Sequence, residues 1–198
     1  MKLPKEIKLY LDFIESNLCK IPADKLEEFG KKLNIKTLDK KELFSSSGMI
    51  QTDIGFIING LIRSYYIDDK GKDITVKFYT ENSFVTHYSA FLNNTPSSYS
   101  FVCLEPVTLV TISSEAINFA YDISKDFEKF GRLVAENVLK IQESRIESFL
   151  FKNAEQRYND FLIDYPNLFS RISLTHLCSY LGVERQTLTR LRQKIANK

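Results

Sequence analysis

The spacing of hydrophobic residues changes twice along the chain. In roughly the first 40 residues they recur every three or four positions, as in Ile7, Leu11 and Ile14, which is the spacing of one helix face. From about residue 36 to residue 112, hydrophobic and polar residues alternate, as in Ile74–Phe78, and alternation is typical of half-buried strands. Helical spacing then returns. The pattern predicts N-terminal packing helices, a β region and C-terminal helices.

The β region is predicted to contain pairs of short strands. Phe56–Tyr66 and Ile74–Phe78 flank a turn signal at Asp68–Gly71, and together they predict a hairpin. Tyr99–Leu104 and Val107–Ile112 predict a second pair. Several short strands joined by turns indicate an antiparallel sandwich or roll. With helices on both sides of this region in the sequence, the predicted fold class is α+β.

The longest helix is predicted at residues 124–151, where Gly131 is the only glycine and proline is absent. At 1.5 Å per residue such a helix is about 40 Å long. Because a small roll cannot cover every apolar side of it, we expect the helix to pack against its twin in a homodimer; a brace within one chain is the alternative. The residues expected at the dimer contact are Phe127, Phe130, Val134, Val138 and Ile141.

Three local signals predict the helices that follow. Asn153–Gln156 has the sequence of a capping box, Ser173 can cap a short helix, and Gly182 can supply the turn after that helix. Two helices that meet at a tight turn are therefore expected. In the second of them Leu188 and Leu191 continue a buried stripe, and polar residues occupy the other faces.

The polar faces of that second helix carry guanidinium and amide groups. An α-helix fits the major groove of B-DNA, where Arg pairs with guanine and Gln with adenine. From residue 151 onward there are 8 Lys and Arg against 4 Asp and Glu, whereas the first 150 residues hold 19 against 21. The pattern predicts a DNA-binding helix-turn-helix; the alternative is a helical hairpin with a solvated basic face. The predicted base-reading residues are Arg185, Gln186 and Arg190, and the predicted phosphate contacts are Ser173, Thr175, Thr187, Thr189, Arg192 and Lys194.

The segment Leu181–Arg190, with the sequence Leu-Gly-Val-Glu-Arg-Gln-Thr-Leu-Thr-Arg, resembles the turn and recognition helix of the Crp/Fnr superfamily of bacterial transcription regulators. The resemblance implies a cyclic-nucleotide-binding-like β-roll as effector and sensor domain at residues 1–123, a long dimerisation helix at 124–151 and a helix-turn-helix DNA-binding domain at 152–198. It also implies a homodimer on a palindromic double-stranded DNA site, with RNA polymerase as a further candidate partner. The sequence stops about four residues after Lys194, so we expect little or no wing.

The segment that holds the ligand in that family departs from the family's pattern. Nucleotide-binding members hold the ribose with a Gly-Glu pair and the cyclic phosphate with an Arg followed by Ser or Thr. The matching positions here are Thr86-His87 and Ser97-Ser98, and no Arg or Lys lies between Lys77 and Lys125. A buried phosphate needs a cation, so we expect no ordinary binding of cyclic AMP and either an unknown small-molecule effector or none. The candidate effector pocket consists of Thr86, His87, Ser97, Ser98 and Tyr99.

Few residues are suited to catalysis or to metal binding. His87 and His176 are the only histidines, and Cys19, Cys103 and Cys178 are odd in number and far apart, which favours reduced thiols over disulfides, metal sites or iron–sulfur clusters. We expect no cofactor, no metal and no enzyme activity. His87 is expected to pack among aromatic residues, with a ligand contact or haem ligation as alternatives.

Two rival functions remain beside DNA-binding regulation. One is a cupin-like β-roll that binds or converts a small molecule and carries a helical tail, and the other is a scaffold that uses the long helix to bind a partner. The first lacks convergent titratable groups. The sequence has no run of 18 apolar residues and no secretory leader, so we expect no membrane contact and a cytoplasmic location.

Overall fold

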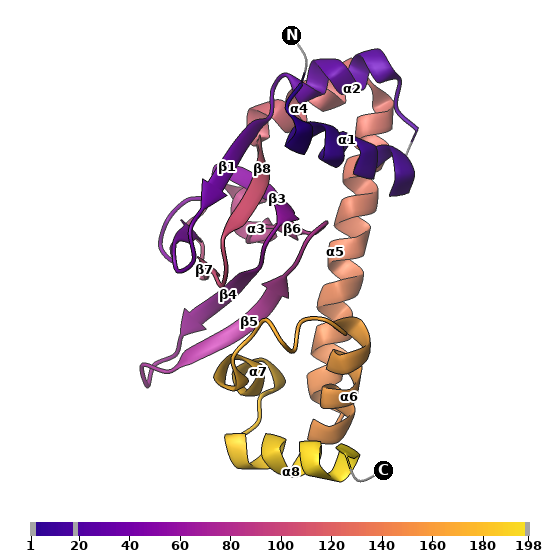
Figure 1. Ribbon diagram of the computed structural model, residues 1–198. Coiled ribbons are helices and arrows are strands. Elements are labelled where there is room, and N and C mark those ends of the chain that lie inside the picture. Colours follow the sequence, from indigo (N-terminus) through magenta and orange to yellow (C-terminus); the bar gives the residue numbers. More distant parts are fainter. Residues whose placement is uncertain (1–2, 18–19, 197–198) are drawn as a thin grey trace. The chain divides into compact units, whose positions relative to one another are not determined.

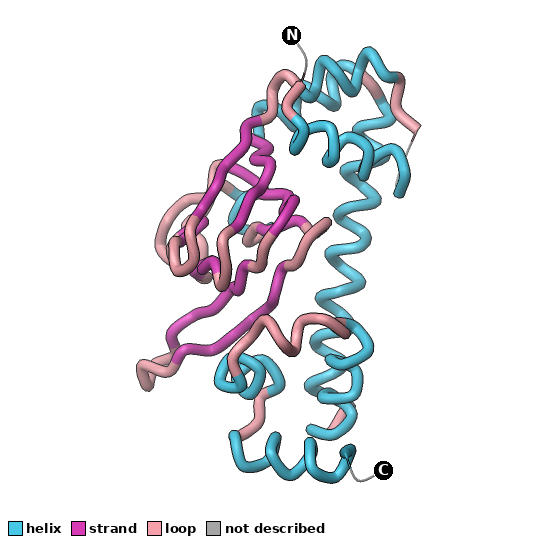
Figure 2. The backbone as a smooth tube through the Cα atoms, in the orientation of Figure 1, coloured by secondary structure: helices cyan, strands magenta, loops and turns pink. Residues whose placement is uncertain are grey.

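The computed structural model of the chain describes residues 3–17 and 20–196. The chain divides into two compact units, one formed by Met1–Ser64 and Phe78–Asn137 and the other by Tyr65–Lys77 and Val138–Lys198. The strands, magenta in Figure 2, all lie between residues 34 and 113.

Two four-stranded sheets form the β part of the chain. The first has the strand order β1-β8-β3-β6, and the pairs β1–β8, β3–β8 and β3–β6 are antiparallel, with Ile54 opposite Ile112. The second has the order β2-β7-β4-β5, with β2 antiparallel to β7. The strand bounds are β1 Asn34–Leu38, β2 Leu43–Ser45, β3 Asp53–Asn59, β4 Ile62–Ile67, β5 Asp73–Tyr79, β6 Phe84–Val85, β7 Ser100–Cys103 and β8 Val107–Ser113. The predicted α+β class with an antiparallel roll is confirmed.

The stretch Phe56–Tyr66, which the sequence presents as one strand of a hairpin, belongs to two strands in different sheets. The chain leaves β3 at Asn59 and enters β4 at Ile62, and Gly60 between them has φ +107°. A Cβ at Gly60 would lie 2.5 Å from the carbonyl oxygen of Pro106. Only glycine fits this backbone conformation and this close approach, so Gly60 marks where the chain crosses from one sheet to the other.

Alternating side chains of the first sheet enter two different cores. Ile57 and Leu109 face the second sheet, in a core that also contains Phe101 and Cys103. Their neighbours Phe56 and Val110 belong to the opposite core, which the helices cover. Strand alternation separates the two sets, and β3 and β8 of the first sheet are therefore buried on both faces, whereas β1 is largely exposed.

The helical core of this unit is rich in aromatic rings. Tyr10 contacts Phe56 and Phe84 with centroid distances of 4.7 and 6.1 Å, and Phe29 contacts Phe127 at 4.9 Å. Burial raises the pKa of Tyr10 well above its ordinary value. Figure 1 shows the contributing helices beside the N-terminal part of α5. The helices of this core are α1 Lys5–Asn17, α2 Ala23–Gly30, α4 Ser114–Ile123 and the first turns of α5 Lys125–Phe151.

Helices α6 (Ala154–Asp164), α7 (Leu174–Leu181) and α8 (Arg185–Ala196) belong to the second unit. The predicted capping box is confirmed: the backbone N–H of Gln156 donates to Asn153 Oδ1 at 3.0 Å, and the N–H of Asn153 donates to Gln156 Oε1 at 2.9 Å. In the same unit the backbone N–H of Thr75 donates to Ser179 Oγ at 2.8 Å, and this hydroxyl donates to the carbonyl of Asp73 at 3.2 Å.

Cys103 lies in the core between the sheets and Cys178 in α7; both are buried free thiols, while Cys19 falls outside the described residues. Over residues 3–17 and 20–196, no group of three or more His, Cys, Asp or Glu side chains is arranged to hold a metal ion. No helix in this part of the chain is both long and apolar enough to cross a membrane.

Candidate nucleic-acid interface

Helices α7 and α8 begin and end where the sequence signals indicated. Ser173 Oγ accepts from the backbone N–H of His176 at 3.1 Å and so caps α7. Gly182 ends the helix with φ +65° and ψ +41°, the left-handed conformation that a side chain disfavours. Helix α8 starts at Arg185, and Leu188 and Leu177 are buried. The buried leucines fix which face of α8 remains exposed.

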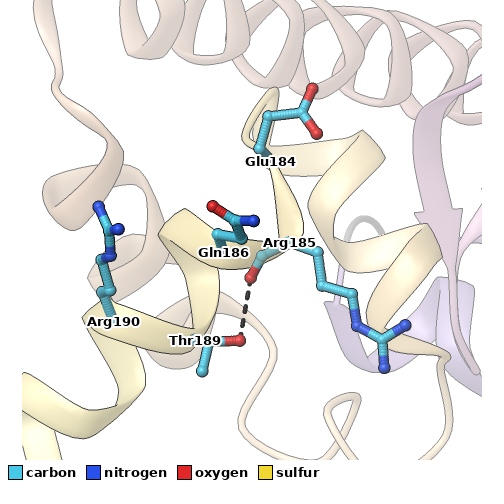
Figure 3. Close-up of a pocket in the computed structure, with 5 residues that line it drawn as sticks. All are labelled: Glu184, Arg185, Gln186, Thr189 and Arg190. Carbon is cyan, nitrogen blue, oxygen red and sulfur yellow. Dashed lines mark hydrogen bonds between the residues drawn. The ribbon is translucent and has the colours of Figure 1, made fainter.

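The exposed face of α8 carries the three residues predicted to read bases. Figure 3 shows Arg185 and Arg190 extending from the helix in opposite directions, with Gln186 and Thr189 between them. Among the described residues, no hydrogen bond or ion pair engages either guanidinium. Arg185, Gln186, Thr189 and Arg190 line an open pocket of about 840 Å³ together with Glu184. Because no described residue engages the side chains of Arg185, Gln186 and Arg190, their donors are available to an external partner.

The residues predicted to contact phosphates fall into two groups. Lys194 and Arg192 already have partners: Lys194 Nζ lies 2.7 Å from Glu155 Oε2, and the Arg192 guanidinium stacks over Phe169 at 4.8 Å. Thr189 donates its hydroxyl to the carbonyl of Arg185 at 3.0 Å. A phosphate contact by any of the three would have to compete with these interactions.

The second group is freer. Thr187 is exposed on α8, and Thr175 is exposed in the first turn of α7. Ser173, also exposed, accepts a hydrogen bond as the α7 cap, which leaves its own hydroxyl proton free to donate. Ser173 and Thr175 therefore lie at a helix N-terminus, where backbone N–H groups and the helix dipole favour a phosphate.

Two residues at this face were missed by the sequence reasoning. Glu184 lines the same pocket as Arg185 and lies one residue before α8. Its carboxylate reduces the positive potential at the exposed face of this helix. Gln193 is exposed and follows Gln186 by seven residues, close to two turns, so both amides point the same way. The seven-residue spacing was the signal that could have identified it.

The predicted effector residues come together in one hydrogen-bonded cluster around His87. Its Nδ1 lies 3.2 Å from Ser97 Oγ, and its Nε2 lies 3.2 Å from Ser89 Oγ. The ring lies against that of Tyr99 with a centroid distance of 4.5 Å and the ring planes tilted by 41°. Burial lowers the pKa of His87 from its ordinary value, which favours the neutral imidazole. The backbone N–H of Ser98 also approaches Nδ1, at 3.4 Å.

Gln51 completes this cluster and was not identified from the sequence. Its Oε1 accepts from the backbone N–H of His87 at 2.7 Å and from Thr86 Oγ1 at 3.3 Å. Gln51 lies in the loop before β3, 35 residues before Thr86, so no local signal connects the two. All polar side chains of this cluster are neutral, which does not suit a cyclic phosphate.

Arg63 on β4 is a buried cation that the sequence reasoning also overlooked. It is 4% exposed and is already engaged by contacts within the chain. Its neighbour Ile62 points into the core between the sheets. Because successive strand residues face opposite sides, the Arg63 side chain leaves on the face away from that core.

The residues predicted at the dimer contact lie on a face of α5 that the chain itself partly covers. Phe127 is 1% exposed and Phe130 is buried beside it, both in the helical core, with Val134 packed against them. Val138 and Ile141 continue the same helix face further along, half-buried and exposed respectively. A different stripe of α5 is bare: Leu139, Ile146 and Leu150 are 59%, 58% and 70% exposed. We call these three residues the pairing stripe.

Comparison with known proteins identifies the domain that contains the candidate effector cluster. Residues 35–123 match the cyclic nucleotide-binding domain family. This stretch contains strands β2 to β8, all of β1 except Asn34, and α3, Tyr88–Asn93. No curated protein matches the chain by sequence.

Solved structures resemble the chain over most of its length at low sequence identity. FixK2 from Bradyrhizobium japonicum aligns with a TM-score of 0.72 and 13% identity, covering 83% of this chain and 85% of that one. A protein described as a Crp/Fnr-family transcriptional regulator from Eubacterium rectale aligns at 0.67 and 15%, covering 89% and 84%. The c-di-GMP responsive global regulator CLP from Xanthomonas campestris aligns at 0.66 and 15%, covering 88% and 92%. Residues 35–123 therefore form a domain of the cyclic nucleotide-binding type, and the chain has the fold of the Crp/Fnr transcription regulators.

Proposed function

We propose that the protein is a sequence-specific DNA-binding transcription regulator that acts in the cytoplasm as a homodimer. The observation that carries the proposal is the exposed face of α8, where Arg185, Gln186 and Arg190 have side chains that no described residue engages. An unengaged Arg can fork onto guanine O6 and N7, and a Gln amide can pair with adenine. Residues 152–198 are the proposed DNA-binding domain, and residues 1–123 the proposed sensor.

Helix α5, residues 124–151 in the predicted division, is the proposed dimer helix. Three large aliphatic side chains at steps of seven and four residues make the pairing stripe continuous along one helix face. Exposed apolar surface of this kind is characteristic of an interaction site. Since Phe127 and Phe130 are used inside the chain, we place the contact with the second copy at Leu139, Ile146 and Leu150 instead. A twofold dimer then presents two reading helices to a palindromic site.

The proposed sensor does not respond to cyclic AMP. The cluster around His87 offers neutral hydrogen-bonding groups, and a charge-assisted pair to a phosphate is roughly twice as strong as a neutral hydrogen bond. An anion held there without a cation would bind about a thousandfold more weakly if the loss is about 4 kcal/mol. Any effector of this cluster is therefore an uncharged or weakly anionic molecule.

Base reading is tested by selecting sites from random DNA and then measuring affinity for every single-base variant of the selected site. Arg185→Ala or Arg190→Ala should cost about 1–3 kcal/mol and relax preference at one base position of each half-site. Arg192→Ala is the matched control, because Arg192 is predicted to contact a phosphate rather than a base and its guanidinium lies over Phe169. It should weaken binding to all sequences alike and flatten the salt dependence. Unchanged preference in both alanine variants contradicts the assignment of α8 as the reader.

The effector claim is tested by calorimetric titration with cyclic AMP and cyclic GMP, beside a DNA-binding assay with and without each nucleotide. We expect no saturable binding at micromolar nucleotide and DNA binding that does not depend on either. Micromolar affinity, or a tenfold gain in DNA affinity, would show that the cation argument fails.

A further inference from the structure

At the C-terminus of α7, side chains from two other helices of the second unit bond to the end of this helix. A helix leaves its last four carbonyls without partners inside the helix. Cys178 O accepts from the backbone N–H of Val183 at 3.0 Å, and Ser179 O accepts from the N–H of Gly182 at 3.3 Å. Two carbonyls remain, those of Tyr180 and Leu181.

Two arginines from other helices satisfy these remaining carbonyls. Arg145 of α5 donates from Nη2 to Tyr180 O, and Arg157 of α6 donates from Nε to Leu181 O at 3.0 Å. Cations are favoured at this end of a helix, because the unpaired carbonyls form the negative end of its dipole. Helix α7 is thereby held by α5 and α6 at once.

Aromatic rings enclose the guanidinium of Arg145. Its Cζ lies 3.8 Å from the ring centroid of Tyr180 and 4.3 Å from that of Phe149 on the same helix as Arg145. The Phe149 ring also covers Gly182, where an added Cβ would come within 3.0 Å of it. Burial lowers the pKa of Arg145. A guanidinium suits this position better than an ammonium, because it is planar and can donate in its plane while it stacks on a ring.

We propose that Arg145 is the positioning residue that fixes the α7–α8 pair on the dimer helix, and so sets the separation of the two DNA half-sites that the protein reads. The inference rests on the proposed function, a DNA-reading homodimer. Helix α8 follows α7 after only Gly182, Val183 and Glu184, so an α7 held on α5 leaves α8 little freedom. Arg145 lies one residue before Ile146 of the pairing stripe. Arg145, which holds α7, and the residues Ile146 and Leu150 of the proposed dimer contact therefore lie within the same two turns of α5.

Half-site spacing is the property that such a connection controls. Two reading helices of a dimer must lie about one turn of DNA apart, roughly 34 Å, to enter successive major grooves. A rigid connection favours one spacing, because the second half-site is then presented at high effective concentration only at that distance. A loose connection allows the dimer to bind several half-site spacings, and the second half-site then increases the affinity less at each of them.

The experiment measures the affinity of parent and Arg145→Gln for a single half-site and for paired half-sites whose separation varies in single base-pair steps. The parent should prefer one separation over those two base pairs away by at least about tenfold. In Arg145→Gln this preference should fall below about threefold, while affinity for a single half-site stays within about threefold of the parent. Arg132→Gln is the control: the same change on the same helix, at an exposed residue whose ion pair among the described residues is with Glu136, and it should keep the parent's preference.

A second measurement does not depend on DNA. Spin labels at K140C on α5 and Q193C on α8, both exposed positions, with Cys19 replaced by serine and labelled chains diluted in unlabelled parent, report the distance between the two helices. The distribution should be narrow in the parent and broad in Arg145→Gln. Arg145→Lys keeps the charge and should broaden it partly; it replaces Arg145→Gln in both measurements where the glutamine variant does not fold.

The outcomes separate this inference from the proposed function. A parental spacing preference and a narrow distribution in the Arg145 variant overturn the inference. Equal losses on single and paired half-sites also overturn it, since Arg145 would then merely support the fold of the helix pair. A parent that binds neither half-site arrangement refutes the proposed function, and the spin-label distances still decide whether Arg145 holds α8 in place.

Discussion

The two ends of helix α5 have the same hydrophobic spacing but different roles. In the first turns Phe127 and Phe130 are buried against Phe29 and Phe84 of the same chain. In the last turns Ile146 and Leu150 are exposed. A helix has several faces, and the apolar face that is buried in the first turns of α5 differs from the apolar face that is exposed in its last turns. Apolar periodicity therefore shows that a helix buries surface, without showing whether the surface is buried in its own chain or in another.

The comparison predicts that substitutions at the two ends separate chain stability from dimerisation. The largest effect should come from Phe127→Ala. Removing a buried ring from a close-packed core should cost about 3–5 kcal/mol of unfolding free energy. Dimer dissociation, measured at a temperature where the variant remains folded, should not change. Chemical denaturation and sedimentation provide the two readings, and a dissociated but equally stable variant would reverse the assignment of the two ends.

The next largest effect is expected from Ile146→Glu. Two carboxylates placed in a shared apolar contact lose hydration without gaining a partner. The dissociation constant of the dimer should rise by at least about a hundredfold, or about 2.7 kcal/mol, with little change in the stability of the separated chain. Ile163→Glu is the control, at an isoleucine on α6 that is 76% exposed, more than Ile146, and lies outside the pairing stripe; it should leave the dimer intact.

Gly131→Ala tests the buried end of α5 more finely. Alanine favours a helix over glycine by about 1 kcal/mol, yet a Cβ at this position would lie 2.1 Å from the hydroxyl oxygen of Tyr121. We expect a net loss of about 1–2 kcal/mol, since overpacking outweighs propensity. In a Tyr121→Phe background the loss should be smaller, because the clashing oxygen is gone while the ring atom Cζ would still lie 2.9 Å from the added Cβ. Thermal unfolding of the four proteins of this cycle measures the coupling.

The smallest effect should belong to Arg132→Gln. Arg132 and Glu136 form an exposed ion pair one turn apart, and such pairs contribute about 0.5 kcal/mol or less. Unfolding free energy should change by no more than that, and the change should vanish in high salt. A loss above about 1 kcal/mol would mean that Arg132 has a further contact, such as one with the second copy.

Local signals predicted much of the fold, including the bounds of α7 and the turn before α8. Ser173, Gly182 and the Asn153–Gln156 box act through bonds within a few residues, and so the sequence shows them directly. The division of Phe56–Tyr66 between two sheets could not be predicted, because it depends on Gly60 lying against Pro106, 46 residues away in the sequence.

The contacts that position the candidate site were hidden for the same reason. Arg145 lies 35 residues before the carbonyl that it bonds, and Gln51 lies 36 residues before the His87 backbone. Neither belongs to a motif, and an Arg in a helix or a Gln in a loop is ordinary surface composition until the fold brings its partner near. Sequence patterns predicted which polar residues of α8 are exposed, and the structure was needed to find the residues that hold this helix in place.

The two buried thiols offer a consequence of practical use. Burial raises the pKa of Cys103 to about 11 and that of Cys178 above its ordinary value, and the thiolate is the form that reacts with alkylating reagents. Cys103 belongs to one compact unit and Cys178 to the other. With Cys19 replaced, the alkylation rate of each thiol reports how often its own unit opens. Mass spectrometry of timed alkylation would therefore measure two separate opening rates in one protein.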